Sequence, residues 1–191
     1  AVQAQVIYSE PAFPTPEDEV TVFFNASEGN GGLEDCGCDI YLHTGVITNL
    51  SSSPSDWRYV PTTWGVADAE WQMTPVAGED NLYSYTFSPS VEAYYNVPGG
   101  ETVEQMAFVF RDGSGNQTGR ATGGGDIFLD LFEGGAGFTA VLQSPASNAI
   151  IAQTGETIPV RVAVSEAATL TITDNGEELI STTTDLLEYD L

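Results

Sequence analysis

One stretch of the sequence, residues 39–73, holds the side chains best suited to gripping a ligand. It contains the only histidine of the chain, His43, and all three tryptophans, Trp57, Trp64 and Trp71. Aromatic rings can hold sugars because the axial C–H face of a pyranose is apolar and stacks on a ring, while nearby polar groups satisfy the hydroxyls. Such a site needs two or three rings set at an angle and little else.

The residues just before the tryptophans predict a strand with two different faces. In an extended chain over residues 39–43, Tyr41 and His43 share one face, and Ile40 and Leu42 share the other. We expect the apolar pair in the core and the other pair on an available surface.

A polar loop is expected to follow this strand. It opens at residues 44–45, runs through the Ser- and Pro-rich residues 51–56, and then delivers Trp57, Arg58 and Tyr59 in succession. Trp57 is the strongest candidate for an exposed ring, because it follows the polar loop and precedes an arginine.

The alternative for each aromatic residue is a place in the core, where tryptophans of a β-sandwich are often found. Trp64, which precedes Gly65, and Trp71, which precedes Gln72, look more like packing residues. The candidate binding set nevertheless comprises Tyr41, His43, Trp57, Arg58, Tyr59 and Trp64.

The sequence favours a non-catalytic role for these residues. His43 has no serine or cysteine nucleophile motif around it, so a hydrogen-bonding role is expected. Although carboxylates are numerous, none sits in a recognisable catalytic setting.

No metal or cofactor site can be placed from the sequence. Cys36 and Cys38 lack the second pair of a zinc site, which leaves a local disulfide or two thiols. Residues 112–116 resemble a calcium loop but lack the downstream bidentate glutamate, so we expect a turn. No cofactor is predicted, and calcium elsewhere on the acidic surface stays open.

The charge balance excludes nucleic acid as a partner. The chain of 191 residues carries 28 Asp and Glu against four Arg and no Lys, a net charge of -24. Nothing could neutralise a row of phosphates, and an anionic membrane surface is disfavoured for the same reason. No apolar run is long enough for membrane insertion.

The N-terminal residues and the acidic surface favour a secreted or cell-surface protein. The first residues, Ala1 to Gln5, look like the small-residue end of a signal peptide. Salty surroundings would screen the self-repulsion of the acidic surface.

The pattern of short strands predicts an all-β protein, an antiparallel β-sandwich module followed by the start of a second, immunoglobulin-like β domain. We expect the sandwich over residues 6–133, a Gly-rich linker over 134–138 and the partial second domain over 139–191. Strands are predicted near residues 6–8, 19–24, 39–43, 82–87, 105–111, 126–131, 139–142, 158–164, 168–173 and 178–181, with one helical turn within 88–95.

Several motifs in residues 6–131 resemble a known family. FPTPEDEVTVFFNAS, DIYLHTGVITNLSSSPSDWRYVPTTWG, LYSYTF, and MAFVFRDGSGNQTGR with GGGDIFLDL are similar to the N-terminal starch-binding-type module of secreted amylase-like proteins of Bacteroidetes, related to carbohydrate-binding modules of families 25 and 26. The HTGVIT to DWRYV block is the most specific part. The resemblance implies a non-catalytic sandwich that holds α-glucan chains near an enzyme, with Tyr41, His43 and Trp57 as binding residues. His43 replaces a second tyrosine of the family pattern, and Cys36-Gly37-Cys38 lies outside that pattern.

Two functions therefore stand side by side. The first is non-catalytic binding of α-glucan polysaccharide or oligosaccharide by an accessory module of a larger secreted glycoside hydrolase. The second is a structural or adhesive module of a cell-surface protein or extracellular filament, for which self-assembly stays open. Exposure of the rings separates them, because at least two of the rings must be coplanar with an open groove under the first function and buried under the second.

Overall fold

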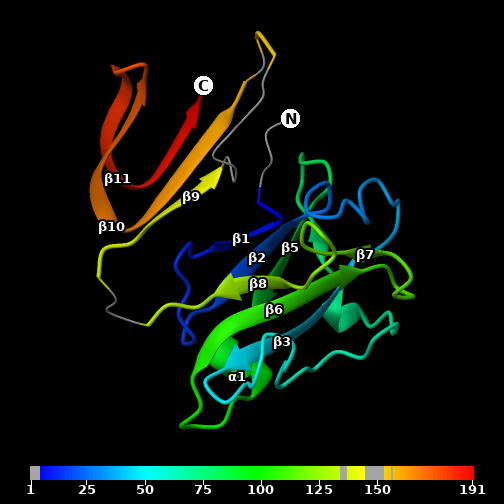
Figure 1. The fold of residues 1–191 in the computed structure, drawn as a ribbon. Helices are drawn as coiled ribbons and strands as arrows, with labels where there is room; N and C mark the ends of the chain where they lie inside the picture. The colour runs from blue at the N-terminus through cyan, green and yellow to red at the C-terminus, as the bar shows by residue number, and fades with distance from the viewer. Residues whose placement is uncertain (1–4, 134–136, 145–152, 156) are drawn as a thin grey trace. The chain divides into compact units, whose positions relative to one another are not determined.

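The computed structural model describes residues 5–133, 137–144, 153–155 and 157–191. The chain forms two units, residues 6–134 (the N-terminal unit) and residues 135–191 (the C-terminal unit). Most of the predicted linker, and residues 1–4 of the predicted export segment, lie outside the described residues. The predicted all-β antiparallel fold is confirmed (Figure 1).

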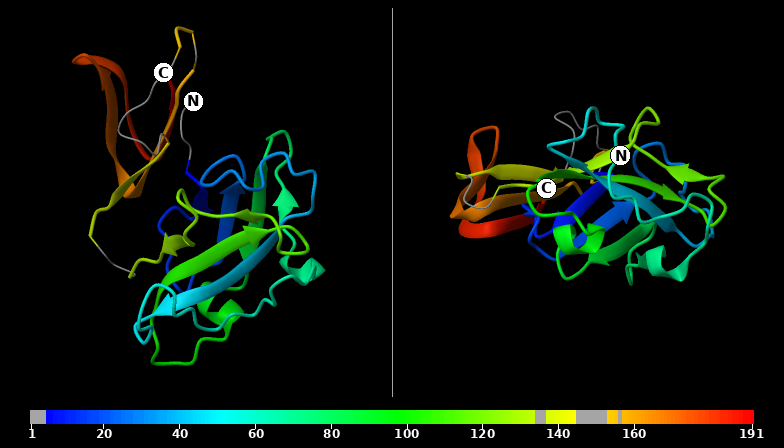
Figure 2. Two further views of the ribbon diagram at one scale, coloured as in Figure 1. Left: turned by 45° about the vertical axis from the view of Figure 1, so that its right-hand side comes forward. Right: turned by 90° about the horizontal axis from the view of Figure 1, so that it is seen from below.

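The N-terminal unit consists of two antiparallel sheets packed face to face (Figures 1 and 2). In the first sheet, the order β1-β2-β5-β4 joins β1 (Ile7–Glu10), β2 (Val20–Asn25), β5 (Leu82–Phe87) and β4 (Thr74–Pro75). In the second sheet, β6 (Val103–Arg111) pairs with β3 (Tyr41–Thr48), β7 (Thr118–Gly119) and β8 (Ile127–Asp130). The strand β6 is therefore central, with β3 along one side.

The core lies between these sheets and is built from alternate residues of each strand. On β2, Val20, Val22 and Phe24 are buried, as the alternation predicted. The rings of Phe24 and Phe110 stack across the two sheets with centroids 3.9 Å apart. Burial of these large side chains is the main stabilising contribution to the sandwich.

The strand β3 is longer than predicted. The expectation that the chain opens into a loop at residues 44–45 is wrong, because β3 stays paired with β6 through Thr48. Thr44 faces the core, where its hydroxyl donates to the carbonyl of Ala107 and bonds the hydroxyl of Tyr95. A buried threonine satisfied in this way fits a strand interior.

The predicted helical turn is the helix α1 (Val91–Tyr95). Its N-cap is Ser90, whose side chain accepts a hydrogen bond from Ala93 N–H, and it ends at Asn96 in the left-handed conformation. A short 3₁₀ helix, η1 (Ala69–Trp71), precedes β4.

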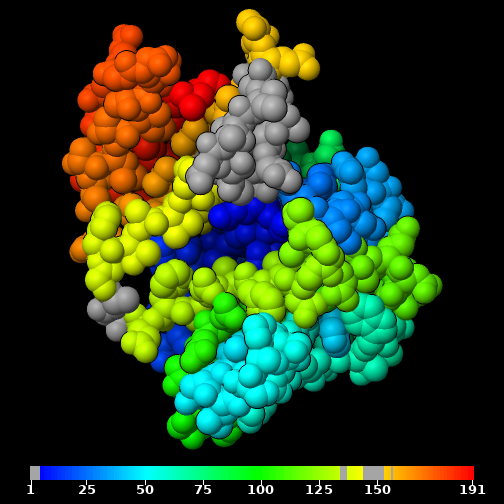
Figure 3. Space-filling view, in the orientation of Figure 1, coloured from blue at the N-terminus to red at the C-terminus, as the bar shows by residue number. Residues whose placement is uncertain are grey.

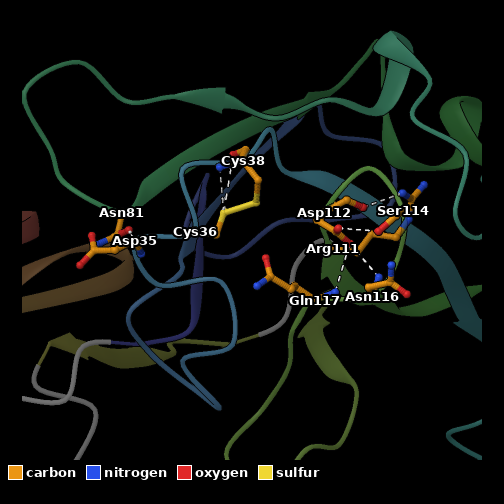
Figure 4. Close-up of a disulfide and its surroundings, with 9 residues drawn as sticks. All are labelled: Asp35, Cys36, Cys38, Asn81, Arg111, Asp112, Ser114, Asn116 and Gln117. Atoms are coloured by element: carbon orange, nitrogen blue, oxygen red, sulfur yellow. Dashed lines mark hydrogen bonds between the residues drawn. A yellow bond between two sulfur atoms is a disulfide. The ribbon is translucent and has the colours of Figure 1, made fainter.

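Of the two alternatives for the cysteines, the structure has the disulfide. Cys36 and Cys38 are bonded to each other across Gly37 (Figure 4). The neighbouring loop is held by a pair of hydrogen bonds between Asp35 and Asn81. Among the described residues there is no free thiol.

The C-terminal unit is a three-stranded antiparallel sheet of order β11-β10-β9, with β9 at Ala140–Ser144, β10 at Pro159–Asp174 and β11 at Glu177–Asp190. Two predicted strands, 158–164 and 168–173, are one strand, β10, with a register shift between Ala163 and Ala168. A tight turn joins β10 to β11, with both Asn175 and Gly176 at positive φ. The immunoglobulin-like assignment of this unit stays a prediction. Of the described helices, none has the length and apolar character to cross a membrane.

Candidate functional site

The outer face of β3 carries the first residues of the predicted site. Leu42 and Val46 point into the core, and alternation therefore places Tyr41, His43 and Gly45 on the outer face. The alternation predicted for this strand is confirmed, although Tyr41 on the outer face is buried.

The polar loop after β3 is closed by one aspartate. The side chain of Asp56 accepts hydrogen bonds from the backbone N–H of Ser52 at 2.8 Å and from its hydroxyl at 3.0 Å. These hydrogen bonds lower the pKa of the Asp56 carboxyl. The loop lies at the surface of the N-terminal unit, in cyan in Figure 3.

The chain then returns and lies against β3 at Gly45. Arg58 N–H donates to the carbonyl of Val46 at 2.8 Å, and Val46 N–H donates to the carbonyl of Arg58 at 3.0 Å. A Cβ at position 45 would lie 2.8 Å from Val60 Cγ2 and 3.0 Å from the Arg58 carbonyl oxygen. The absence of a side chain at Gly45 is what lets the returning segment lie this close.

Three rings of the predicted set meet on this face. The imidazole of His43 lies between the indoles of Trp57 and Trp64, with centroids 5.8 Å and 5.2 Å away and interplanar angles of 30° and 88°. We call this set the aromatic cluster. Trp64 is 44% exposed. Trp57 is half-buried, and its indole N–H is buried without an acceptor among the described residues.

The orientation of His43 is fixed by Thr62. The hydroxyl oxygen of Thr62 lies 2.6 Å from His43 Nδ1 and accepts a hydrogen bond from Thr44 N–H at 3.3 Å. The hydrogen bond between Thr62 and Nδ1 fixes the ring orientation, and in the tautomer in which Thr62 donates to Nδ1 the ring proton is on Nε2.

The His43 ring is held in its neutral form. Burial is the first cause that lowers its pKa below 6.5, and the charge of Arg111 lowers it further. In the described part of the chain Nε2 has no hydrogen-bond partner, so in that tautomer its N–H is available as a neutral donor beside Trp64.

A tight hairpin supports Trp64 from below. The side chain of Asp112 accepts from Asn116 N–H at 2.8 Å, from Gln117 N–H at 3.1 Å and from the hydroxyl of Ser114 at 2.6 Å (Figure 4). This confirms the expectation of a turn in residues 112–116. A Cβ at Gly115 would lie 2.6 Å from Trp64 Nε1, so the indole lies directly over this glycine.

Arg111 joins that hairpin to the segment that carries Trp64. Its guanidinium donates from Nη2 to the carbonyls of Val66 at 2.7 Å and Thr63 at 3.3 Å, and from Nη1 to those of Asp112 at 3.0 Å and Gly113 at 3.4 Å. The residue is 0% exposed, and burial lowers the pKa of its guanidinium. Arginine stays charged in proteins even so.

Tyr41 does not belong to the accessible surface. Its ring is buried, and the guanidinium of Arg111 lies over it with Cζ 5.6 Å from the ring centroid. The expectation that Tyr41 lies on an available surface is wrong, because its neighbour on β6, Arg111, lies over its ring.

Arg58 and Tyr59 hold the loop rather than face outward. Arg58 Nε forms an ion pair with Glu101 Oε1 at 2.7 Å, and the Tyr59 hydroxyl donates to Glu101 Oε2 at 2.5 Å. Thr48 donates to the same carboxylate at 2.5 Å. These hydrogen bonds, first that of Thr48 and then that of Tyr59, lower the pKa of Glu101. Four side chains thus fasten the start of the returning segment to the end of β3.

The structure reverses the predicted ranking of the tryptophans. Trp64, expected to pack, is the most exposed ring of the cluster, whereas Trp57, expected to be exposed, is half-buried. Trp71 packs against the core as expected, with its indole N–H buried.

Four residues that build the site were missed by the sequence reasoning: Thr62, Glu101, Arg111 and Gly115. Only Arg111 carried a usable signal, since a charged residue at the end of the most apolar strand must find partners when it is buried.

The described residues hold no grouped metal ligands, and the cavity that they form lies away from the aromatic cluster. In the described ranges, no group of three or more His, Cys, Asp and Glu side chains is arranged to hold a metal ion. A cavity of about 380 Å³ lies elsewhere in the N-terminal unit and contains none of the predicted site residues. It is lined by Pro16, Glu17, Glu92, Thr102, Val103, Glu104, Leu131, Phe132 and Glu133.

Comparison of the chain with family models and curated proteins gives no significant match.

Proposed function

We propose that the N-terminal unit is a non-catalytic carbohydrate-binding module that holds an α-glucan chain on the aromatic cluster. The observation that carries the proposal is Trp64. This indole is 44% exposed although its edge rests on Gly115, next to the imidazole of His43. An exposed tryptophan in a fixed position is costly to leave in water and useful for stacking on a sugar.

The polar group beside this ring suits a neutral ligand. With its proton on Nε2, the neutral His43 ring can donate to a sugar hydroxyl without the cost of burying a charge. The net charge of -24 also disfavours an anionic ligand. An uncharged, hydroxyl-rich chain is the class that meets both conditions.

The ring angles favour a curved chain over a flat one. His43 is nearly perpendicular to Trp64 and inclined by 30° to Trp57, so the cluster offers walls at an angle rather than one flat platform. The choice of α-glucan within this class rests on the sequence resemblance, as does the place of the unit in a larger secreted, amylase-associated protein.

Binding by this cluster should be weak. An aromatic contact contributes about 0.5–1.5 kcal/mol beyond area burial if values for ring pairs transfer to sugars. Added to the burial of apolar ring surface, two such contacts and one hydrogen bond agree with dissociation constants in the millimolar to high-micromolar range.

Isothermal titration calorimetry with maltoheptaose tests the proposal, with cellohexaose as the flat-chain comparison. We expect saturable heat with maltoheptaose only. In Trp64→Ala the affinity should fall by at least about 2- to 13-fold, the equivalent of one ring contact without its area burial. The matched control is Trp71→Phe, which changes a tryptophan that has no ring contact with His43 among the described residues. If no soluble glucan produced heat, the structural or adhesive module would become the better explanation.

A further inference from the structure

Arg111 is a buried charged residue at the end of β6, where the sheet itself does not require a charge. The residue is 0% exposed, yet in the described part of the chain its guanidinium has no carboxylate partner. Its partners are four backbone carbonyl oxygens, and its Nε has no acceptor there. Burying a charge is expensive, so an apolar side chain at this buried strand end would cost less.

The four carbonyls come from two segments that are far apart in the sequence. Two belong to Thr63 and Val66, on either side of Trp64, and two belong to Asp112 and Gly113, in the hairpin on which the Trp64 ring rests. The guanidinium therefore ties the support of the indole to the backbone that carries it.

We propose that Arg111 is the positioning residue of the aromatic cluster, which locks Trp64 in its binding orientation before any ligand arrives. The functional half of this proposal rests on the proposed carbohydrate-binding function, because only a ligand gives the orientation a purpose. A side chain that is already ordered in the free protein loses little conformational entropy on binding. The affinity is therefore higher without any new contact.

The shape of the side chain explains why arginine is needed. Its planar fork presents donors in two directions, so Nη1 faces the hairpin while Nη2 faces the Trp64 segment. The ring of Tyr41 below the plane supports the cation on its face. Lysine would keep the charge, but a single ammonium is too compact to bridge carbonyls on both segments.

The test uses Trp64 as its own reporter in the absence of ligand. In the full chain carrying Trp57→Phe and Trp71→Phe, Trp64 is the only tryptophan, and acrylamide quenching then measures its accessibility. We expect Arg111→Lys to increase the quenching constant and to lower the fluorescence anisotropy. The control Arg120→Lys changes an arginine that pairs with Asp126 instead and should alter neither. Equal quenching in folded Arg111→Lys and in the control would overturn the proposal.

A binding measurement on the full chain with its tryptophans intact separates this inference from the proposed function. If the unaltered chain binds maltoheptaose, Arg111→Lys should bind about 2- to 13-fold more weakly, the loss expected when one side chain must be ordered on binding. Increased quenching of Trp64 in Arg111→Lys with unchanged affinity for maltoheptaose would overturn the inference. If the unaltered chain binds no glycan but quenching of Trp64 still increases in Arg111→Lys, the positioning role of Arg111 is upheld. Only the carbohydrate-binding function is then rejected.

A measurement without substitution covers the case in which Arg111→Lys does not fold. In the NMR spectrum of the unaltered chain, the Nη protons of Arg111 should exchange slowly and show nuclear Overhauser effects to the backbone of Thr63 and Val66. Rapidly exchanging Nη protons without these effects would contradict the arrangement.

Discussion

Gly45 gives the sharpest test of how the aromatic cluster is assembled. In Gly45→Ala the new methyl group would lie 2.8 Å from Val60 Cγ2 and 3.0 Å from the carbonyl oxygen of Arg58. The valine side chain can rotate, but the carbonyl belongs to a segment fixed by two backbone hydrogen bonds to Val46. The substitution must therefore push this segment away from β3.

The magnitude follows from the cost of overpacking, which is typically about 1–3 kcal/mol. For a unit of about 130 residues, the usual unfolding entropy converts this cost into a fall in melting temperature of about 4–11 °C. Differential scanning calorimetry of the full chain measures the shift. Gly99→Ala is the control, because a Cβ at Gly99 meets nothing within 4 Å. Equal melting temperatures for the two variants would refute the close approach at Gly45.

Three further predictions address single groups. Because burial lowers the pKa of His43, and a ligand that covers the ring would lower it further, affinity for maltoheptaose should be constant above pH 6.5 and fall below it, as calorimetry at several pH values would show. Glu101 has a lowered pKa in the folded state, so its contribution to stability is complete above about pH 4.5 and is lost as the pH falls through the lowered value. In urea unfolding at several pH values, the free energy of unfolding of Glu101→Gln should therefore fall less steeply with acid than that of the unaltered chain. The disulfide between Cys36 and Cys38 closes a loop of only three residues, so replacing both with serine should lower the melting temperature by at most about 6 °C.

The strands were the most predictable part of the fold. Alternation placed Val20 and Phe24 in the core and His43 on the outer face, because side-chain direction in a strand is a local property. The end of β3 was not predictable in this way. Gly45 looks like a strand breaker in the sequence, whereas its role is to admit a neighbouring segment.

The site was predictable in its membership but not in its arrangement. The sequence brought His43, Trp57 and Trp64 into one candidate set, and the structure brings their rings together. Which indole is exposed depends on long-range partners, chiefly Arg111 and the hairpin at Gly115, about fifty residues further along the chain. Predictions from the adjacent residues in the sequence were therefore wrong about the exposure of Trp57 and Trp64.

The indole N–H signals of the three tryptophans report most directly whether a glycan chain binds at the aromatic cluster. In a ¹⁵N-correlated NMR titration of the full chain with maltoheptaose, assigned through single Trp→Phe variants, the Trp64 signal should shift progressively and saturate, whereas the Trp71 signal stays in place. A saturating shift of Trp71 with Trp64 unmoved would place binding elsewhere and contradict the account.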